Sequence, residues 1–416
     1  MDITISVDLI QLSFESKPDI FLDLISVPFI IFLIFLLLVT FSINIFYSKL
    51  NLTFKKRYKG LALAGLSILL FFIMEQKKHG VFKRRMPYIA ICEGTKYFNK
   101  EPLQYASIQQ NLKTNNKVNI VFVLGESVRA KNMQLNGYQR ETNPLLSKRT
   151  DVSSIKNLYT PNTYTAKSVP QILTSQSIND SFNKDIYSIY AVLNKANYNT
   201  IWMGNQTPEI SYRDLIQQNK EIKLIDVEHS VLSYNKKLDG ELLNIFKNRY
   251  KKDQTNFYTI HMIGSHWWYE SRYPKEFQKF KPIIKTKYLP SNTKVEMINS
   301  YDNTIVYLDY FLNNIISFLE KKDDNTILIY LSDHGEILGE DGKWLHAQDH
   351  EASKNPACLI WYSKTFKEKY KDKINNLKMN IKGEVTTDFL YHSVLDIIDV
   401  QSFKYNTNKS IFGVNP

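Results

Sequence analysis

Two short apolar runs that end in acidic residues constrain the fold more than any other feature of this sequence. Residues 117–127 read KVNIVFVLGES, and residues 325–335 read NTILIYLSDHG. Runs of Val, Ile and Leu without alternating polar residues are typical of strands that are buried on both faces of a sheet. In each run a small residue is followed by a carboxylate, so polar side chains come directly after two buried strands.

Further apolar runs alternate with helical patterns along the rest of the chain. The additional strand candidates are Asn199–Met203, Asn256–His261 and Ala357–Trp361. The helical patterns are Ile186–Lys195, Asp239–Lys247 and Val295–Leu319. This alternation predicts an α/β fold whose central, mostly parallel sheet is covered by helices on both faces. Because no repeat or low-complexity linker follows residue 117, we expect residues 117–416 to form one domain.

An uncharged apolar stretch marks the N-terminal region. Residues 25–47 read ISVPFIIFLIFLLLVTFSINIFY, which as a helix is long enough to cross about 30 Å of hydrocarbon. A second uncharged stretch, residues 60–74, is shorter than a normal span. The sequence therefore predicts a membrane anchor over residues 1–75, with one transmembrane helix near 24–48 and a second span at 60–74 left open. Residues 76–116 are expected to be a connector.

The formal net charge of +12 does not by itself indicate a nucleic-acid partner. The lysines are scattered rather than arranged in a stripe, and no nucleic-acid motif accompanies them. We therefore expect no nucleic acid and assign the charge to attraction toward anionic lipid headgroups at a membrane. Two cysteines, Cys92 and Cys358, lie far apart outside any C-x-x-C pattern, so their pairing stays open.

The residues that follow the predicted strands are the first candidates for a functional site. In a mostly parallel sheet, ligands bind beyond the carboxyl ends of the strands. Glu126 follows the first strand, Asp333 and His334 follow another, and His266 lies shortly after a third. Carboxylate oxygens with imidazole nitrogens form a normal zinc ligand set. The structural alternatives are a polar strand end, a helix N-cap at Ser127 and a histidine packed beside tryptophan.

A threonine-rich segment supplies a candidate nucleophile. Residues 160–170 read TPNTYTAKSVP, and a helix could start near Thr165. A hydroxyl at a helix N-terminus beside a cation is a usable nucleophile. An N-capping turn is the alternative for Thr165. His346 and His350 are four residues apart and could share a helix face, and His350 is expected to be solvated.

Taken in order, these segments resemble bacterial phosphoethanolamine transferases of the alkaline-phosphatase/sulfatase superfamily. The likeness is carried by NIVFVLGESVRAKNMQLNGYQRETNP (119–144), TYTAKSVP (163–170), HMIGSHWWYESRYPKEF (261–277), YDNTIVYLDYFL (301–312) and SDHGEILGEDGKWLH (332–346). The resemblance implies an alkaline-phosphatase/sulfatase-like sandwich around a central sheet.

The resemblance also implies roles for individual residues. It assigns a catalytic zinc to Glu126, Thr165, Asp333 and His334, with one ion expected and a second left open. Thr165 would be the nucleophile that carries phosphoethanolamine. His266 and His346 would be catalytic contacts to the substrate phosphate, or ligands of a second metal, and Asn205 and Gln206 would bind substrate. By the same resemblance, we expect loop carboxylates at Glu336, Glu340 and Asp341. Glu336 is expected at most to contact a metal ligand without binding the metal itself.

The implied reaction moves phosphoethanolamine from phosphatidylethanolamine to an envelope acceptor: lipid A, a core sugar, a glycan or a protein. A protein of this kind would reside in the inner membrane with its catalytic domain on the periplasmic side. The cysteines that commonly flank the nucleophile loop are absent, because Pro161 and Gln171 stand there. Phosphoglycerol transfer or phosphate-ester hydrolysis remains an alternative within the superfamily. A non-catalytic, membrane-anchored protein that binds lipid or glycan is the alternative of another class.

Overall fold

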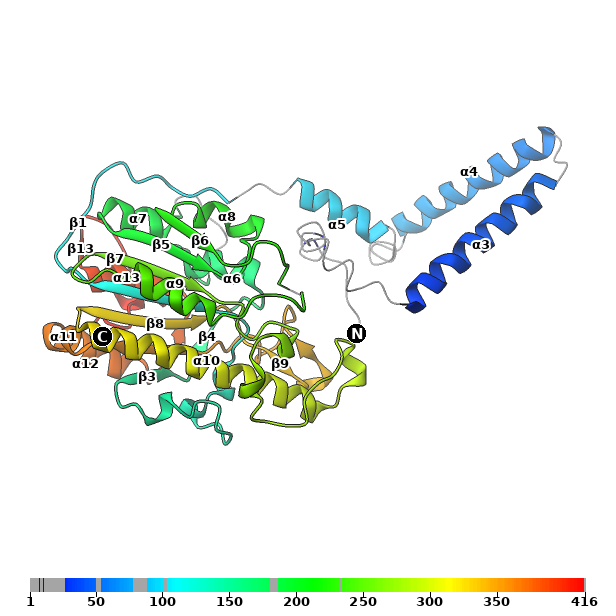
Figure 1. The fold of residues 1–416 in the computed structure, drawn as a ribbon. Helices are drawn as coiled ribbons and strands as arrows, with labels where there is room; N and C mark the ends of the chain where they lie inside the picture. Colours follow the sequence, from blue (N-terminus) through cyan, green and yellow to red (C-terminus); the bar gives the residue numbers. More distant parts are fainter. Residues whose placement is uncertain are drawn as a thin grey trace. The chain divides into compact units, whose positions relative to one another are not determined.

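The chain divides into two compact units, Met1–Pro102 and Leu103–Pro416. The computed structural model describes residues 7, 10, 27–49, 54–77, 88–99, 103–179, 186–231 and 233–414 (Figure 1). Parts of the predicted anchor and connector, including residues 11–26 and 78–87, lie outside the described residues.

The first unit contains three described helices: α3 (Val27–Lys49), α4 (Phe54–Lys77) and α5 (Tyr88–Phe98). The first turns of α4 carry four basic residues, Lys55, Lys56, Arg57 and Lys59, which shorten its uncharged part. Counted over the described residues alone, none of the helices is both long and apolar enough to cross a membrane. The membrane anchor predicted over residues 1–75 stays a prediction.

The second unit is built on a seven-stranded sheet. In spatial order its strands are β3 (Val152–Ile155), β11 (Cys358–Tyr362), β8 (Thr326–Ser332), β2 (Asn119–Gly125), β7 (Asn256–His261), β5 (Asn199–Gly204) and β6 (Glu221–Leu224). Four of the six neighbouring pairs are parallel, whereas β11 runs antiparallel to both β8 and β3. All five predicted strands are confirmed, and the sheet is mixed, with a parallel centre.

Helices cover both faces of this sheet, as predicted (Figure 1). Along β2, Ile120, Phe122 and Leu124 belong to one apolar core, and Val121 and Val123 belong to the other. Alternate residues of a strand face opposite sides, so each core fills one face. The first core includes α6 (Thr165–Ile172), α7 (Ile189–Lys195), α8 (Ile210–Ile216), α11 (Lys364–Lys369), α12 (Lys371–Asn380) and α13 (Phe389–Ile398). The second includes α9 (Glu241–Arg249) and α10 (Lys294–Lys322).

Smaller elements complete the second unit. Three two-stranded pairs join β1 (Lys113–Thr114) to β13 (Val400–Gln401), β4 (Leu158–Tyr159) to β12 (Val385–Thr386), and β9 (Ile337–Leu338) to β10 (Trp344–Leu345). Short 3-10 turns span Ala130–Asn132, Gln134–Asn136, Leu146–Lys148, Tyr269–Ser271, Lys275–Phe277, Leu289–Ser291, Glu340–Gly342 and Thr407–Lys409.

The long helix α10 holds the segment that follows β2. Thr293 and Glu296 form a capping box at its start. The buried Asp309 carboxylate accepts hydrogen bonds from the Leu145 and Leu146 amides, at 2.8 and 2.9 Å. About two turns earlier, Asp302 lies 2.7 Å from Arg140 and accepts a hydrogen bond from Asn132 at 2.6 Å. These contacts fix residues 129–146 against the helix.

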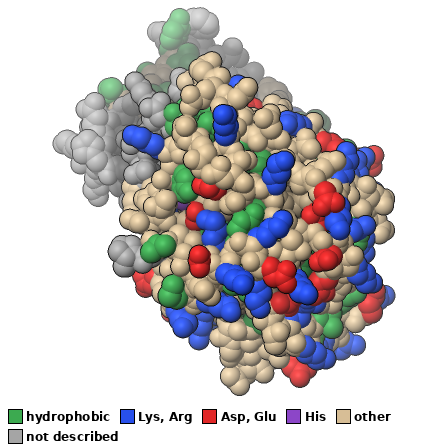
Figure 2. Space-filling view, turned by 90° about the vertical axis from the view of Figure 1, so that its left-hand side faces the viewer, with side chains coloured by type: hydrophobic (Ala, Val, Ile, Leu, Met, Phe, Trp, Pro, Cys, Tyr) green, Lys and Arg blue, Asp and Glu red, His purple; other side chains and the backbone are tan. Residues whose placement is uncertain are grey.

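The surface carries charges of both signs (Figure 2), and no disulfide links the two cysteines. On the face drawn in Figure 2, Lys and Arg side chains are interspersed with Asp and Glu, which is the usual pattern of a solvated surface. Both cysteines are free: Cys92 is half-buried in α5, and Cys358 is buried in β11.

We predict that Ile329→Ala lowers the free energy of unfolding by about 2–5 kcal/mol. Ile329 is fully buried in the central strand β8, so the truncation leaves a cavity. Ile222→Ala on the edge strand β6, where the side chain is 41% exposed, should cost less than about 0.5 kcal/mol. Urea unfolding of the full chain, followed by tryptophan fluorescence, measures both values. Equal losses would contradict the proposed difference between centre and edge.

Candidate functional site

The register of β2 and β8 brings two acidic residues side by side. Gly125 pairs with Ser332 in this parallel ladder. Glu126 and Asp333 are therefore the next residues on two neighbouring strands as the chain leaves the sheet. Both carboxylates are almost completely buried, with exposed fractions of 0% and 1%. Two adjacent buried carboxylates repel each other and need a compensating cation or protons.

The chain turns sharply after β2 to present Glu126. Ser127 adopts a φ of 59°, and its hydroxyl donates to Glu126 Oε1 at 2.8 Å. Gly264, after β7, has a φ of 52°, and a Cβ atom there would lie 2.7 Å from the Glu126 carbonyl oxygen. Only glycine accepts this approach without strain. The loop after β7 thus packs directly on the backbone of Glu126.

His334 completes a group of three metal-ligand side chains. Glu126, Asp333 and His334 each offer one ligand atom, and these atoms all lie within 4.8 Å of one another. His334 Nδ1 lies 2.8 Å from the Gly335 carbonyl oxygen, which assigns the ring proton to Nδ1. The other ring nitrogen, Nε2, lies 3.3 Å from Glu126 Oε1 and 3.3 Å from Asp333 Oδ2. The contact between Nδ1 and the Gly335 carbonyl orients the ring so that Nε2 faces the two carboxylates. Metal-binding histidines are usually oriented by such a contact at their other ring nitrogen.

Two atoms of this group lack hydrogen-bond partners among the described residues. Asp333 Oδ2 and His334 Nε2 are both buried and unpartnered. The other oxygen, Asp333 Oδ1, accepts hydrogen bonds from the Ser127 amide at 3.1 Å and the His334 amide at 2.8 Å. Buried polar atoms rarely stay unpaired. These two unpartnered atoms lie next to the second carboxylate, Glu126, and together they fit a divalent cation.

The electrostatics of the group agree with this interpretation. Burial alone would raise the pKa of the Glu126 carboxyl, but its interactions with His334 hold that pKa well below the usual range. Burial and the nearby charge of Glu126 raise the pKa of Asp333. Burial alone would lower the pKa of His334, but the two carboxylates raise it. Without a cation, a proton on His334 has to balance the two acids.

Thr165 is the first residue of α6, where the sequence predicts a helix start. Its hydroxyl is almost buried and donates to Glu126 Oε2 at 2.9 Å. The first amides of a helix have no partner within it, and the macrodipole places partial positive charge there. The hydroxyl therefore lies next to a group that fits a cation and at a helix end that favours negative charge.

The loop before Thr165 is held by hydrogen bonds. The Thr160 amide donates to the Lys354 carbonyl at 2.9 Å, and the Ala347 amide donates to the Thr163 carbonyl at 2.8 Å. Gln171, in the helix that Thr165 begins, accepts a hydrogen bond from Thr387 at 2.7 Å. The loop is thus tied to the segment that carries His346.

The two predicted substrate residues after β5 have different surroundings. Gln206 Nε2 donates to the Met262 carbonyl at 2.6 Å and to Glu126 Oε2 at 3.3 Å, so its side chain lies at the carboxylate group. Asn205 Nδ2 donates to Asp239 at 2.9 Å and to the Lys237 carbonyl at 2.8 Å. Its donors therefore anchor the neighbouring loop, and its substrate-binding role stays a prediction.

His266 and His346 lie near the metal-ligand group. The ring of His346 is 4.7 Å from the ring of His334 and 5.4 Å from the ring of His266, measured between centroids. Burial lowers the pKa of His266 to about 3, which keeps its imidazole neutral. His266 Nδ1 lies 2.6 Å from the Trp267 carbonyl oxygen. The structure therefore gathers three histidines around one space.

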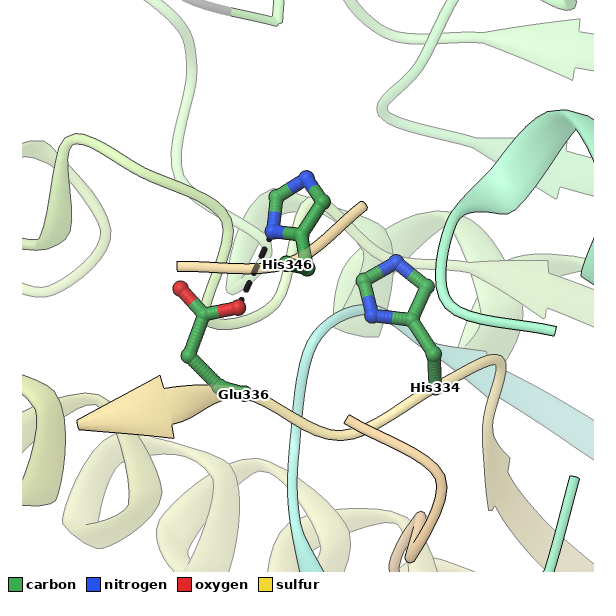
Figure 3. A group of neighbouring side chains, drawn as sticks. All are labelled: His334, Glu336 and His346. Carbon is green, nitrogen blue, oxygen red and sulfur yellow. Dashed lines mark hydrogen bonds and ion pairs between the residues drawn. The ribbon is translucent and has the colours of Figure 1, made fainter. Parts of the chain in front are cut away.

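Glu336 corrects the expectation that it is a loop carboxylate. Its side chain is completely buried. Oε1 accepts a hydrogen bond from the Tyr269 hydroxyl at 2.6 Å, and Oε2 lies 2.9 Å from His346 Nδ1. Figure 3 shows the carboxylate turned toward His346 beside His334. The acidic residue follows Gly335 closely in sequence, but its partner Tyr269 comes from another loop, so no local signal indicated the burial.

The remaining members of this acidic stretch lie at its surface. Glu340 lies 2.6 Å from Arg129, and Asp341 is largely exposed, as expected for loop carboxylates. His350 is half-buried rather than solvated, because its Nδ1 accepts a hydrogen bond from the Ala352 amide at 3.0 Å. The prediction for His350 was therefore wrong.

His261 and Arg272 are buried behind the loop that carries His266. His261 lies between Trp202 and Tyr212, with ring centroids 5.2 and 6.2 Å away, and burial lowers its pKa to about 4. Arg272 donates to the His266 carbonyl at 2.8 Å and to the Trp267 carbonyl at 3.1 Å. No sequence pattern singled out Arg272, whose contacts hold the backbone of the loop that carries His266.

Comparison with known proteins places these features in a family. A sequence model described as Sulfatase matches residues 118–400. Phosphoethanolamine transferase EptA of Escherichia coli K12 is 29% identical over 350 residues, which are 78% of this chain and 59% of that protein. The chain thus spans less than two thirds of the length of this relative, and its resemblance to phosphoethanolamine transferases is confirmed.

Solved structures show the same fold. The integral membrane protein lipooligosaccharide phosphoethanolamine transferase A from Neisseria meningitidis has a TM-score of 0.78 at 23% identity, covering 99% of this chain and 82% of that chain. The C-terminal periplasmic domain of EcEptC from Escherichia coli, in complex with Zn, has a TM-score of 0.64 at 21% identity, covering 75% and 91%. With this fold, and with a family match that spans its α/β unit, the chain belongs to the Sulfatase family.

Proposed function

We propose that this protein transfers phosphoethanolamine from phosphatidylethanolamine to an envelope acceptor, through a phospho-threonine intermediate on Thr165. One observation carries the proposal: the Thr165 hydroxyl donates to Glu126, which belongs to a buried carboxylate–histidine group with orphaned atoms. The similarity to the Escherichia coli transferase over 78% of this chain supports the substrate class.

The proposed cofactor is zinc, held by Glu126, Asp333, His334 and the hydroxyl of Thr165. Two carboxylates and an imidazole are common zinc ligands, and the Zn-bound EcEptC domain shares the fold. When bound, the ion would favour deprotonation of the threonine hydroxyl and neutralise charge on the phosphoryl oxygens. We propose one ion per chain, because the second group with metal-ligand side chains, at Glu336 and His346, is already hydrogen-bonded internally.

The protein's own groups divide the work of a double displacement. In the first step the Thr165 hydroxyl loses its proton and Oγ forms a bond to phosphorus, while the bond to the diacylglycerol oxygen breaks and that oxygen gains a proton. In the second step an acceptor oxygen loses its proton and attacks phosphorus, the bond from phosphorus to Thr165 Oγ breaks, and Oγ regains a proton. The N-terminal amides of α6 favour the negative charge that develops at phosphorus in both steps.

The remaining site residues are assigned to substrate. We propose that His266 and Gln206 contact the phosphoryl group or its ethanolamine, since both lie around the space in front of Glu126. The acceptor is lipid A, a core sugar, a glycan or a protein hydroxyl, each of which presents an oxygen nucleophile. We propose that the reaction takes place at the inner membrane, with the α/β unit on the periplasmic side.

Replacing one carboxylate should remove the metal. Asp333→Asn turns an anionic ligand into a neutral amide, so we expect zinc affinity to fall by at least about 100-fold. Asp226→Asn makes the same change at a buried carboxylate that binds loop amides elsewhere; it should keep one zinc per chain. Elemental analysis of the full chain after gel filtration measures both. Unchanged zinc content in Asp333→Asn would refute the ligand assignment.

Replacing the nucleophile should abolish transfer but not metal binding. Thr165→Ala removes the only atom that can form the intermediate, so transfer of labelled headgroup should fall below detection. Thr165→Ser keeps a hydroxyl and should retain partial activity. Intact-protein mass spectrometry of the wild type with phosphatidylethanolamine should show a phosphoethanolamine-sized adduct that is absent from Thr165→Ala. Full activity of Thr165→Ala would show that another residue is the nucleophile.

The acceptor class can be read directly from cells. We expect one class of envelope molecule to lose a phosphoethanolamine-sized mass when Thr165→Ala replaces the wild type. Mass spectrometry of lipid A, core sugars, surface glycans and surface proteins from the two strains makes this comparison. Identical profiles in all four classes would contradict phosphoethanolamine transfer to the envelope.

A further inference from the structure

We propose that Glu336, with Tyr269 behind it, positions His346 as the residue that moves the proton of the transfer reaction. The inference rests on the proposed function and deepens it, because the proposed reaction needs a proton donor and both His266 and His346 lie near the metal-ligand group. Glu336 is a positioning residue in this proposal: it acts through His346 and does not touch substrate.

The first observation is a chain of hydrogen bonds from Tyr269 through Glu336 to His346, in which Tyr269 and Glu336 are completely buried. Tyr269 and Glu336 both have an exposed fraction of 0%. The Tyr269 hydroxyl donates to Glu336 Oε1 at 2.6 Å, and Glu336 Oε2 lies 2.9 Å from His346 Nδ1. A buried carboxylate is held only where its oxygens are satisfied, and here each oxygen has one donor.

The second observation indicates that the hydrogen-bonded group of Tyr269, Glu336 and His346 is not a cation site. His334, Glu336 and His346 also offer ligand atoms within 4.8 Å of one another. Both Glu336 oxygens and His346 Nδ1 are nevertheless engaged with each other or with Tyr269. Of the ligand atoms in the two groups, those that are buried without a hydrogen-bond partner are Asp333 Oδ2 and His334 Nε2. The Glu336 group is therefore a hydrogen-bonded relay.

The relay fixes which nitrogen of His346 can react. A carboxylate only accepts hydrogen bonds, so Nδ1 must carry its proton, and Nε2 is the atom left to exchange one. Figure 3 shows Nδ1 of His346 directed at Glu336, with the opposite side of the ring away from that carboxylate. The contact with Glu336 also holds the ring in one orientation.

His266 lacks this arrangement. Its Nδ1 lies 2.6 Å from the backbone carbonyl of Trp267, which orients the ring but carries no full charge. A carbonyl stabilises an imidazolium far less than a carboxylate does. Nδ1 of His346 faces a carboxylate, whereas Nδ1 of His266 faces a backbone carbonyl. This difference is the reason to assign proton transfer to His346 and substrate contact to His266.

The proton balance follows the two displacement steps. When the bond from phosphorus to the diacylglycerol oxygen breaks, His346 Nε2 gives its proton to that oxygen. When the acceptor hydroxyl attacks the phospho-threonine, its proton returns to Nε2. Thr165 Oγ loses its own proton in the first step and regains one in the second, so protons balance over the cycle and no electron is gained or lost.

The test compares donors whose leaving groups differ in their need for a proton. Diacylglycerol leaves as a strongly basic oxygen, whereas 4-nitrophenol leaves from 4-nitrophenyl phosphoethanolamine without protonation. For Glu336→Gln we expect kcat with phosphatidylethanolamine in mixed micelles to fall about 10–100-fold with little change in KM. The same substitution should lower the rate of the nitrophenol burst by a factor about tenfold smaller than the factor by which it lowers kcat with phosphatidylethanolamine. Zinc content of the full chain should stay at the wild-type value.

Two further variants act as controls. Tyr269→Phe removes only the phenol donor, so it should give a smaller loss with the same dependence on the donor, even if Glu336→Gln fails to fold. Glu340→Gln makes the same Glu-to-Gln change on the neighbouring surface loop, where the side chain lies 2.6 Å from Arg129. It should keep both rates near the wild-type values.

The outcomes are distinct. Equal losses with both donors, or a loss of zinc in Glu336→Gln, would mean that Glu336 supports structure or metal, and would overturn the proposal. A His266→Gln variant that shows the donor dependence while Glu336→Gln does not would transfer the role to His266. If the wild type processes neither donor, the proposed function fails and this inference fails with it.

Discussion

The structure depends on the close approach of two carboxylates at the end of a parallel ladder. Gly125 and Ser332 pair in β2 and β8, so Glu126 and Asp333 emerge together into a space that water does not reach. Such a pair is costly because burial and mutual repulsion both oppose ionisation. His334, the hydroxyl of Thr165 and the amides of Ser127 and His334 offset part of that cost. The orphaned atoms show that the compensation within the chain is incomplete.

The surrounding loops are organised to hold this group rigid. Asp302 and Asp309 of α10 anchor the segment after β2, and Gly264 lets the loop after β7 pack on Glu126. Asp239 accepts hydrogen bonds from the Ile263 and Gly264 amides, both at 2.9 Å. Several of the sequence blocks that carry the family resemblance therefore have a structural role, since they position side chains without touching a substrate.

Most of the sheet could be predicted from sequence because its central strands are buried on both faces and have continuous apolar runs. The direction of β11 could not be predicted, since parallel and antiparallel buried strands share that pattern. The edge strands β3 and β6 were missed because VSSI and EIKL are partly polar and, apart from Ile155, are half-buried or exposed. Glu126, Asp333 and His334 could be singled out because they directly follow predicted strands. Glu336 could not, because its burial depends on Tyr269 and His346, which only the folded chain brings to it.

Two neighbouring carboxylate–histidine groups thus have the same residue types but differ in whether their buried polar atoms have hydrogen-bond partners. In one, Asp333 Oδ2 and His334 Nε2 have no hydrogen-bond partner among the described residues. In the other, Glu336 and His346 satisfy each other and Tyr269. A cation lowers the energy of the first group, whereas in the second it would have to displace hydrogen bonds that already exist. The number of acidic and imidazole groups alone does not distinguish a metal site from a proton relay; the partners of each polar atom do.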